Sequence, residues 1–143
     1  MAKRPREQAV YFLDRCVDHD DIFAALVEVG ALVERHRNHF ADSCPDEVWL
    51  REVGSRGWAV LTRDRMIRRR EVETKAWQEG QAAVFDLTGK TRLRELGSVI
   101  ARSLPKMERV LSNHNRPLWA TVSAAGVVTV VEGQRVGGIK RDR

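Results

Sequence analysis

The strict alternation of apolar runs and amphipathic segments limits the folds that this chain can adopt. Four runs rich in β-branched and aromatic residues predict strands at 9–13, 31–35, 58–62 and 82–87. Three segments with apolar residues at helical spacing separate these runs, at 18–30, 45–54 and 70–79. This order predicts an α/β fold with a mainly parallel sheet, right-handed crossovers and helices on both faces.

The last third of the chain adds one long helical segment and a pair of strands. Residues 91–111 carry apolar side chains at helical spacing, and Pro105 predicts a kink there or a break into two helices. The runs 119–122 and 127–131 flank Ser-Ala-Ala-Gly and predict a β-hairpin. With 143 residues we expect a single domain spanning 1–143, with its core at about 9–112 and a hairpin extension at about 117–133.

Composition indicates a globular protein outside the membrane. Hydrophobic residues make up 43% and charged residues 31% of the chain. No apolar stretch approaches the ~20 residues that span a bilayer, and no apolar segment follows the basic N-terminus as in a secretory signal. The two cysteines, Cys16 and Cys44, form no disulfide framework. We therefore expect a cytoplasmic protein.

The net charge of +5 comes mostly from the two ends of the chain. The basic tails at residues 3–7 and 140–143 carry +2 each, which leaves +1 for the body. The local cluster is more informative, because it surrounds and follows an acidic residue, Asp64; it consists of Arg63, Arg65, Arg68, Arg69 and Arg70. Arg65, Arg68 and Arg69 are the candidate RNA contacts. Basic side chains beside a carboxylate site suit a polyanion such as an RNA backbone. The alternative is a solvated helix start whose arginines pair with Glu71 and Glu73.

Three acidic residues stand where a strand gives way to a helix. Asp14 ends the first apolar run, Asp46 opens a helix after Pro45, and Asp64 follows the third run. In a parallel sheet the carboxyl ends of the strands lie along one edge, where such sheets bind ligands. Carboxylates gathered there repel one another unless a divalent cation or another partner joins them. The pattern predicts a metal site, although each acid could instead serve as an ion-pair or helix-start residue.

Three segments, read together, resemble the PIN-like domains related to VapC-type toxins. They are Phe-Leu-Asp-Arg at 12–15, Pro-Asp-Glu-Val-Trp-Leu at 45–50 and Leu-Thr-Arg-Asp-Arg at 61–65. The resemblance spans roughly residues 9–112 by element order. It implies a three-layer α/β/α fold and a ribonuclease activity that depends on Mg²⁺ or Mn²⁺. It also implies service as the toxin of a type II toxin–antitoxin pair.

The resemblance assigns the catalytic and metal-binding positions to Asp14, Asp46 and Asp64, with Glu47 as an alternative to Asp46. Many PIN domains carry a fourth acid just beyond the third, but Arg65, Met66 and Ile67 follow Asp64 here. The remaining candidates for a fourth acid are Asp42 and Asp86. A zinc site formed by His36, His39 and Cys44 is the weaker alternative, because no Cys-x-x-Cys pair accompanies them.

Two functions follow from these expectations. The first is a metal-dependent endoribonuclease with RNA as substrate and a cognate antitoxin as protein partner, with a homodimer left open. The second is a non-catalytic PIN-like module that binds RNA or a protein. The joint presence of Asp14 and Asp64 favours the first, and the absent fourth acid leaves the second open.

Overall fold

The computed structural model describes residues 8–137. The basic tails expected at 3–7 and 140–143 lie outside this range. The strands are β1 (Val10–Leu13), β2 (Leu32–Arg35), β3 (Ala59–Thr62), β4 (Ala83–Leu87), β5 (Leu118–Val122) and β6 (Val128–Glu132). The α-helices are α1 (Asp20–Glu28), α2 (Asp46–Ser55), α3 (Glu71–Glu79) and α4 (Leu93–Asn113). The 3₁₀ turns are η1 (Arg15–Val17), η2 (His36–Asn38) and η3 (Arg65–Arg68).

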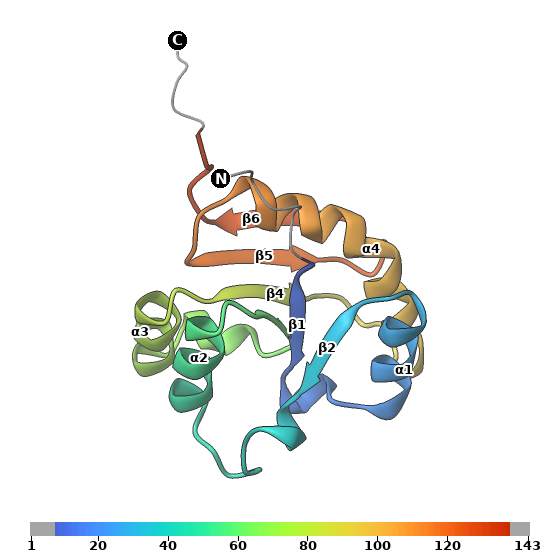
Figure 1. The fold of residues 1–143 in the computed structure, drawn as a ribbon, viewed down its shortest axis with the longest axis horizontal. Helices are drawn as coiled ribbons and strands as arrows, with labels where there is room; N and C mark the ends of the chain where they lie inside the picture. The colour runs from blue at the N-terminus through green and yellow to red at the C-terminus, as the bar shows by residue number, and fades with distance from the viewer. Residues whose placement is uncertain (1–7, 138–143) are drawn as a thin grey trace, which may run out of the picture.

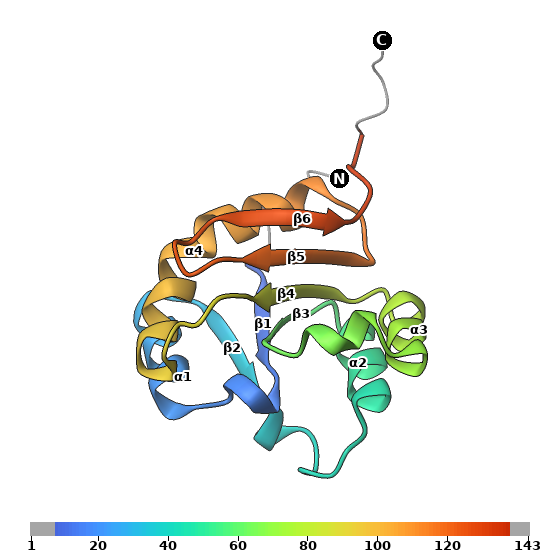
Figure 2. The ribbon, with the colours of Figure 1, turned by 180° about the vertical axis from the view of Figure 1, so that it is seen from behind.

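The strands form one sheet in the order β2-β1-β3-β4-β5-β6. Every neighbouring pair is parallel except β5 and β6, which form the predicted antiparallel hairpin. Helices α1 and α4 pack together on one side of the sheet, and α2 and α3 pack together on the other (Figures 1 and 2). This arrangement confirms the expected α/β/α architecture with a mainly parallel sheet.

The core lies in two layers, one on each face of the sheet. Leu61 of β3 packs with Leu26 of α1 and Ile100 of α4 in the first layer. Val60 of the same strand packs with aromatic residues of the other helices, Trp49 and Trp77, in the second layer. Successive side chains of a strand point to opposite faces, so a central strand covered on both faces reads as a continuous apolar run. This is why β3 is buried along its whole length.

Helix α4 is continuous through Pro105, so the break into two helices that the proline suggested does not occur. Proline removes one backbone hydrogen bond from a helix, which disfavours the helix locally. Pro105 lies on the exposed side of α4, while Leu104 and Met107 are buried against the sheet. We infer that this packing keeps the helix in one piece. No helix among residues 8–137 is long and apolar enough to cross a membrane.

Gly54 lies within α2, whereas its sequence suggested the end of that helix. A Cβ atom at Gly54 would lie 2.2 Å from the carbonyl oxygen of Gly80, just beyond α3. Only glycine therefore allows α2 and α3 to approach so closely. This contact joins the helix that begins at Asp46 to the helix that contains Glu73.

Candidate metal centre

The predicted acids meet at the carboxyl edge of the sheet because β1 and β3 are parallel neighbours. Leu13 and Leu61 are in register, and the backbone N–H of Asp14 donates to the carbonyl of Leu61 over 3.1 Å. Asp64 follows β3 two residues after its end, and Asp46 is the first residue of α2. The sheet thus places all three acids at the edge that the sequence predicted.

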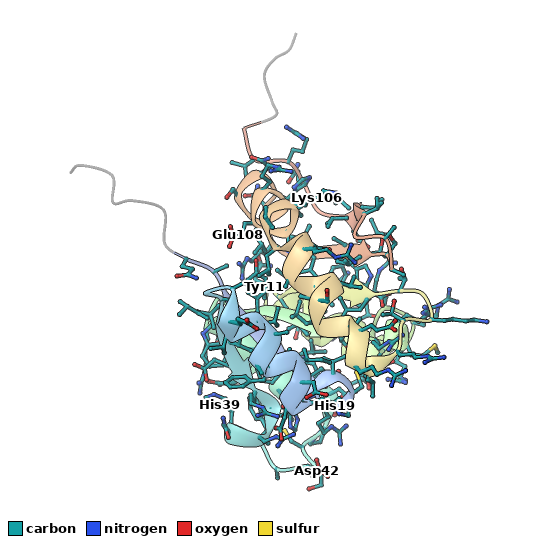
Figure 3. All side chains as sticks on the ribbon, turned by 90° about the vertical axis from the view of Figure 1, so that its right-hand side faces the viewer. Tyr11, His19, His39, Asp42, Lys106 and Glu108 are labelled. Carbon is teal, nitrogen blue, oxygen red and sulfur yellow. The ribbon has the colours of Figure 1, made fainter. Side chains whose placement is uncertain are left out.

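These acids line a hollow of about 360 Å³, which we call the acid hollow. Its lining residues are Asp14, Arg15, Cys16, Asp42, Asp46 and Asp64. Figure 3 shows Asp42 at one end of the molecule, with Lys106 and Glu108 of α4 toward the other. Asp42, a sequence candidate for the fourth acid, is among the residues that line this hollow.

Three carboxylates lie closest together, and one of them was missed by the sequence analysis. One oxygen each of Asp46, Asp64 and Glu73 lies within 4.8 Å of the others, and the three side chains are partly exposed. Within the part of the chain that the structure describes, this is the only group of three or more acids, histidines or cysteines with such spacing. Carboxylate oxygens at this spacing could bind a divalent cation of the Mg²⁺ or Mn²⁺ type.

Arg70 joins the three carboxylates. Its Nη1 lies 2.5 Å from Glu73, 3.3 Å from Asp64 and 4.0 Å from Asp46. Arg15 lies on the other side, with its Nη2 3.6 Å from Asp46. The alternative that the sequence raised, an arginine of this segment paired with Glu73, describes Arg70. The Nη1 atom donates hydrogen bonds to Asp64 and Glu73, and Asp46 Oδ1 accepts one from the Trp49 indole Nε1 over 2.8 Å.

Asp14 is the most buried acid of the hollow, with 4% of its surface exposed. Its Oδ1 accepts a hydrogen bond from the backbone N–H of Arg15 (2.6 Å), and its Oδ2 accepts one from the Thr62 hydroxyl (2.8 Å). Burial raises the pKa of Asp14 from 3.8 to about 6, and the negative charge of Asp46 adds to this shift. The hydrogen bonds oppose the shift, so the carboxyl is held in a fixed orientation at a site that penalises its charge.

Several residues that the sequence raised as candidates lie outside the close carboxylate group and the acid hollow. Glu47, the alternative to Asp46, is neither in the close carboxylate group nor among the residues that line the acid hollow. His39 contacts Glu34 through its Nε2 over 2.6 Å, and His36 is buried. Neither histidine belongs to a group spaced for metal binding within residues 8–137. Cys16 lies against Asp14 and Thr62, and both cysteines are free thiols.

The predicted RNA-contacting residues Arg65, Arg68 and Arg69 line a second hollow next to the first. We call it the arginine hollow; its volume is about 420 Å³. Asp86, the other candidate for a fourth acid, lines this hollow and not the acid hollow. The neighbouring strands explain the proximity of the two hollows, because Asp86 of β4 is in register with Thr62 of β3.

The comparison with known families decides how this geometry is classified. A family model described as “PIN like domain” matches residues 9–89, more than half of the chain. The chain belongs to the PIN-like domain family. Searches of curated proteins and of solved structures gave no significant match.

Membership in the PIN-like family gives the acid hollow a chemical context. PIN-like domains are commonly nucleases, and the acidic group of this PIN-like domain could bind a divalent metal. The matched region contains Asp14, Asp46, Asp64 and Glu73, together with the strands β1, β2, β3 and β4. Glu73 joins Asp46 and Asp64 in the close carboxylate group, and it lies on the next helix instead of directly after Asp64. The local feature that could have identified Glu73 from the sequence is its position in the first turn of α3, close to the arginines at 68–70.

Proposed function

We propose that this chain is a metal-dependent endoribonuclease that uses Mg²⁺ or Mn²⁺ at the acid hollow. The observation that carries the proposal is the group formed by Asp46, Asp64 and Glu73, with carboxylate oxygens within 4.8 Å of one another. This group lies at the carboxyl edge of a parallel sheet, the usual ligand site of such folds. Membership in the PIN-like family supports a nuclease reaction at this position.

The donor set fits the proposed cation. All its ligand atoms would be carboxylate oxygens, from Asp46, Asp64 and Glu73 with Asp14 beside them. Hard cations such as Mg²⁺ and Mn²⁺ prefer oxygen ligands and usually keep several waters, which the open hollow allows. When bound, such a cation supplies a nucleophilic water of lowered pKa and neutralises charge on the phosphate.

The residues of the chain would position the reaction. Asp14 is oriented by Thr62 and the Arg15 backbone, so its carboxylate faces the hollow in one geometry. Arg15 and Arg70 provide positive charge on two sides of the acids, where a phosphodiester would pass. A preorganised arrangement of this kind stabilises charge that develops in a transition state without further reorganisation.

We further propose that the chain acts in the cytoplasm as the toxin of a type II toxin–antitoxin pair. The resemblance of the segments at 12–15, 45–50 and 61–65 to VapC-type proteins supports this proposal. The partner would be an antitoxin that covers the carboxyl edge of the sheet. Expression of the chain alone should then slow growth, and co-expression of its cognate antitoxin should restore it.

One observation favours the second candidate, a non-catalytic module that binds RNA or a protein. Arg70 donates hydrogen bonds to Asp64 and Glu73 and lies 4.0 Å from Asp46, so the cluster can be stable as an ion-pair network without a metal. Under this alternative the carboxylates would be structural and the arginines would bind the partner. The two candidates differ in whether RNA is cut.

The deciding experiment measures cleavage of fluorescent single-stranded RNA by purified protein with Mn²⁺ and with EDTA. We expect cleavage only with Mn²⁺, and none by Asp64→Asn. Glu79→Gln is the matched control, because Glu79 is an exposed acid that pairs with Arg51 instead of the acid hollow. If the wild type cuts no RNA, or Asp64→Asn cuts as fast as the wild type, the nuclease proposal is wrong.

A further inference from the structure

Trp49 links the aromatic core to the carboxylate of Asp46. Both residues lie on α2, three positions apart, and the indole Nε1 of Trp49 donates a hydrogen bond to Asp46 Oδ1 over 2.8 Å. Side chains at this spacing are neighbours on a helix surface, so the contact follows from the sequence of α2. It is the only hydrogen bond that the Asp46 carboxylate accepts within residues 8–137. The indole therefore determines how this carboxylate is turned.

The indole itself has little freedom to move. Trp49 is completely buried, and its ring centroid lies 5.4 Å from that of Phe12 on β1 and 6.2 Å from that of His36 on η2. Side chains in such a close-packed core are held in one rotamer. The Asp46 side chain, by contrast, is 14% exposed and lines the acid hollow. Trp49 thus connects a rigid part of the core to a carboxylate at the surface.

The two oxygens of Asp46 have different surroundings. Oδ1 accepts the hydrogen bond from Trp49, whereas Oδ2 lies 4.0 Å from Nη1 of Arg70. Asp64 divides its oxygens in the same way: Oδ1 accepts a hydrogen bond from the backbone N–H of Met66 over 3.0 Å, and Oδ2 lies 3.3 Å from Nη1 of Arg70. This Nη1 atom lies within 4.0 Å of all three carboxylates of the close group. In both aspartates, one oxygen is held by the protein and the other faces the middle of the group.

We propose that Trp49 is a positioning residue of the metal centre: its indole N–H holds Oδ1 of Asp46, so that Oδ2 is left to bind the cation. This inference rests on the proposed function, because it takes Asp46 as a metal ligand. Carboxylates that bind a metal are themselves hydrogen-bonded to further groups, which orient them and raise the affinity of the site. An indole N–H is a donor only and does not coordinate a cation, so its role is confined to orientation.

Arg15 shows why a neutral donor suits this position. Its Nη2 lies 3.6 Å from Oδ1 of Asp46, and its side chain is 43% exposed. Without the indole, Asp46 would be free to turn toward this guanidinium and to withdraw Oδ2 from the close carboxylate group. A positive partner also opposes the binding of a cation to the same carboxylate, whereas the uncharged indole does not. Trp49 therefore orients Asp46 without competing with the metal.

The test compares Trp49 with Trp77, which lies on α3 in the same core layer (Figure 1). Trp77 is equally buried, but its indole N–H donates to the backbone carbonyl of Leu118 over 3.1 Å. Trp49→Phe and Trp77→Phe each remove one buried indole hydrogen bond, and only the first removes a donor to a carboxylate of the metal centre. In isothermal titrations of the full chain, we expect the Mn²⁺ affinity to fall about tenfold in Trp49→Phe and to stay unchanged in Trp77→Phe. Urea unfolding should show both variants to be less stable than the wild type.

A second measurement needs no variant of Trp49. It follows the indole N–H signals of the wild type by NMR during a titration with Mg²⁺. A cation on Asp46 withdraws electron density from the carboxylate and weakens it as an acceptor, so we expect the Trp49 indole proton to move upfield and that of Trp77 to stay in place. A Trp49 signal that does not move at saturating Mg²⁺ would overturn the proposal. Wild-type Mn²⁺ affinity in Trp49→Phe, or an equal loss in both phenylalanine variants, would overturn it as well and leave Trp49 a packing role only.

Failure of this proposal is distinct from failure of the nuclease proposal. If the wild type and Trp49→Phe cleave RNA with the same dependence on Mn²⁺ concentration, the positioning role alone is refuted. Mn²⁺ binding that depends on Trp49, without any RNA cleavage, would support the positioning role and refute the nuclease. A wild type that binds neither Mn²⁺ nor Mg²⁺ would overturn the positioning role together with the metal centre.

Discussion

The acid hollow and the arginine hollow lie next to each other, but their buried carboxylates have different surroundings. Asp14 and Asp86 are both 4% exposed. Asp14 receives hydrogen bonds from Thr62 and from the Arg15 backbone. Asp86 receives none from the described residues. Equal burial therefore does not imply equal surroundings: the first carboxyl is held in place by hydrogen bonds, and the second has a buried oxygen without a partner.

The two hollows also differ in charge. The acid hollow is lined by four acids and one arginine, so acids predominate. In the arginine hollow, three arginines surround one acid. A cation suits the first environment and a polyanion the second. An RNA strand lying across both would place one phosphate near the metal and a neighbouring nucleotide among the arginines.

The largest expected effect is on catalysis through Glu73. Replacement Glu73→Gln removes a charged oxygen from the close carboxylate group. We expect Mn²⁺-dependent RNA cleavage to fall at least about 100-fold. Glu79→Gln changes the same residue type on the same helix, far from this group, and should leave the rate unchanged. Equal rates in the two variants would show that Glu73 belongs to an ion-pair network only.

The second expected effect is on stability through Asp14. Its folded-state pKa of about 6 lies above the usual 3.8, so the ionised carboxylate destabilises the fold above pH 6. Without metal, Asp14→Asn should raise the free energy of unfolding at pH 7.5 by about 1–3 kcal/mol. The difference should shrink as the pH falls from 6 to 4, because the wild-type acid then becomes protonated.

Urea unfolding in EDTA at pH 7.5, 5 and 4 measures this effect. Asp64→Asn serves as a comparison, because Asp64 is partly exposed and paired with Arg70. A less stable Asp14→Asn at pH 7.5, with the same pH dependence as the wild type, would contradict this description of the acid hollow.

The third expected effect distinguishes Arg68 from Arg65 and Arg69 in the arginine hollow. For Arg69→Ala and Arg65→Ala we expect the log–log salt dependence of RNA binding to fall by about one unit each, without loss of stability. Arg68→Ala should lower the slope similarly and also cost about 0.5–1 kcal/mol, because Arg68 contacts Trp119 and Glu132. Salt titrations by anisotropy and urea unfolding measure the two quantities. A stability loss with an unchanged slope would assign these arginines a structural role.

The smallest effect is expected from Arg70. In the absence of metal its guanidinium occupies the space between Asp46, Asp64 and Glu73. A cation would have to compete with this charge, so Arg70→Gln should increase Mn²⁺ affinity by about two- to fivefold. Isothermal titration measures the change. A lower affinity in Arg70→Gln would mean that Arg70 organises the carboxylates for the metal.

Most of the fold could be predicted from the sequence because its strands are local signals. The central strands are continuous apolar runs, since both their faces are buried, and the hairpin is marked by the turn between β5 and β6. The continuity of α4 through Pro105 was not predictable, because it depends on packing against the sheet.

The site residues also divide into those with a local sequence signal and those whose position depends on packing. Asp14 and Asp64 were predictable because each follows a buried strand, and parallel neighbours bring such positions together. Glu73 was not, because its approach to Asp46 depends on the contact of α2 with α3 at Gly54 and Gly80. The missing partners of Asp86 are likewise a property of the folded chain and have no signal in the sequence.

The most direct test of the metal centre is isothermal titration calorimetry of the metal-free protein with Mn²⁺. We predict one site whose affinity falls at least about tenfold in Asp64→Asn and in Glu73→Gln, but not in Glu79→Gln. A wild type that binds no Mn²⁺, or variants that all bind it equally well, would contradict the assignment of Asp46, Asp64 and Glu73 as a metal centre.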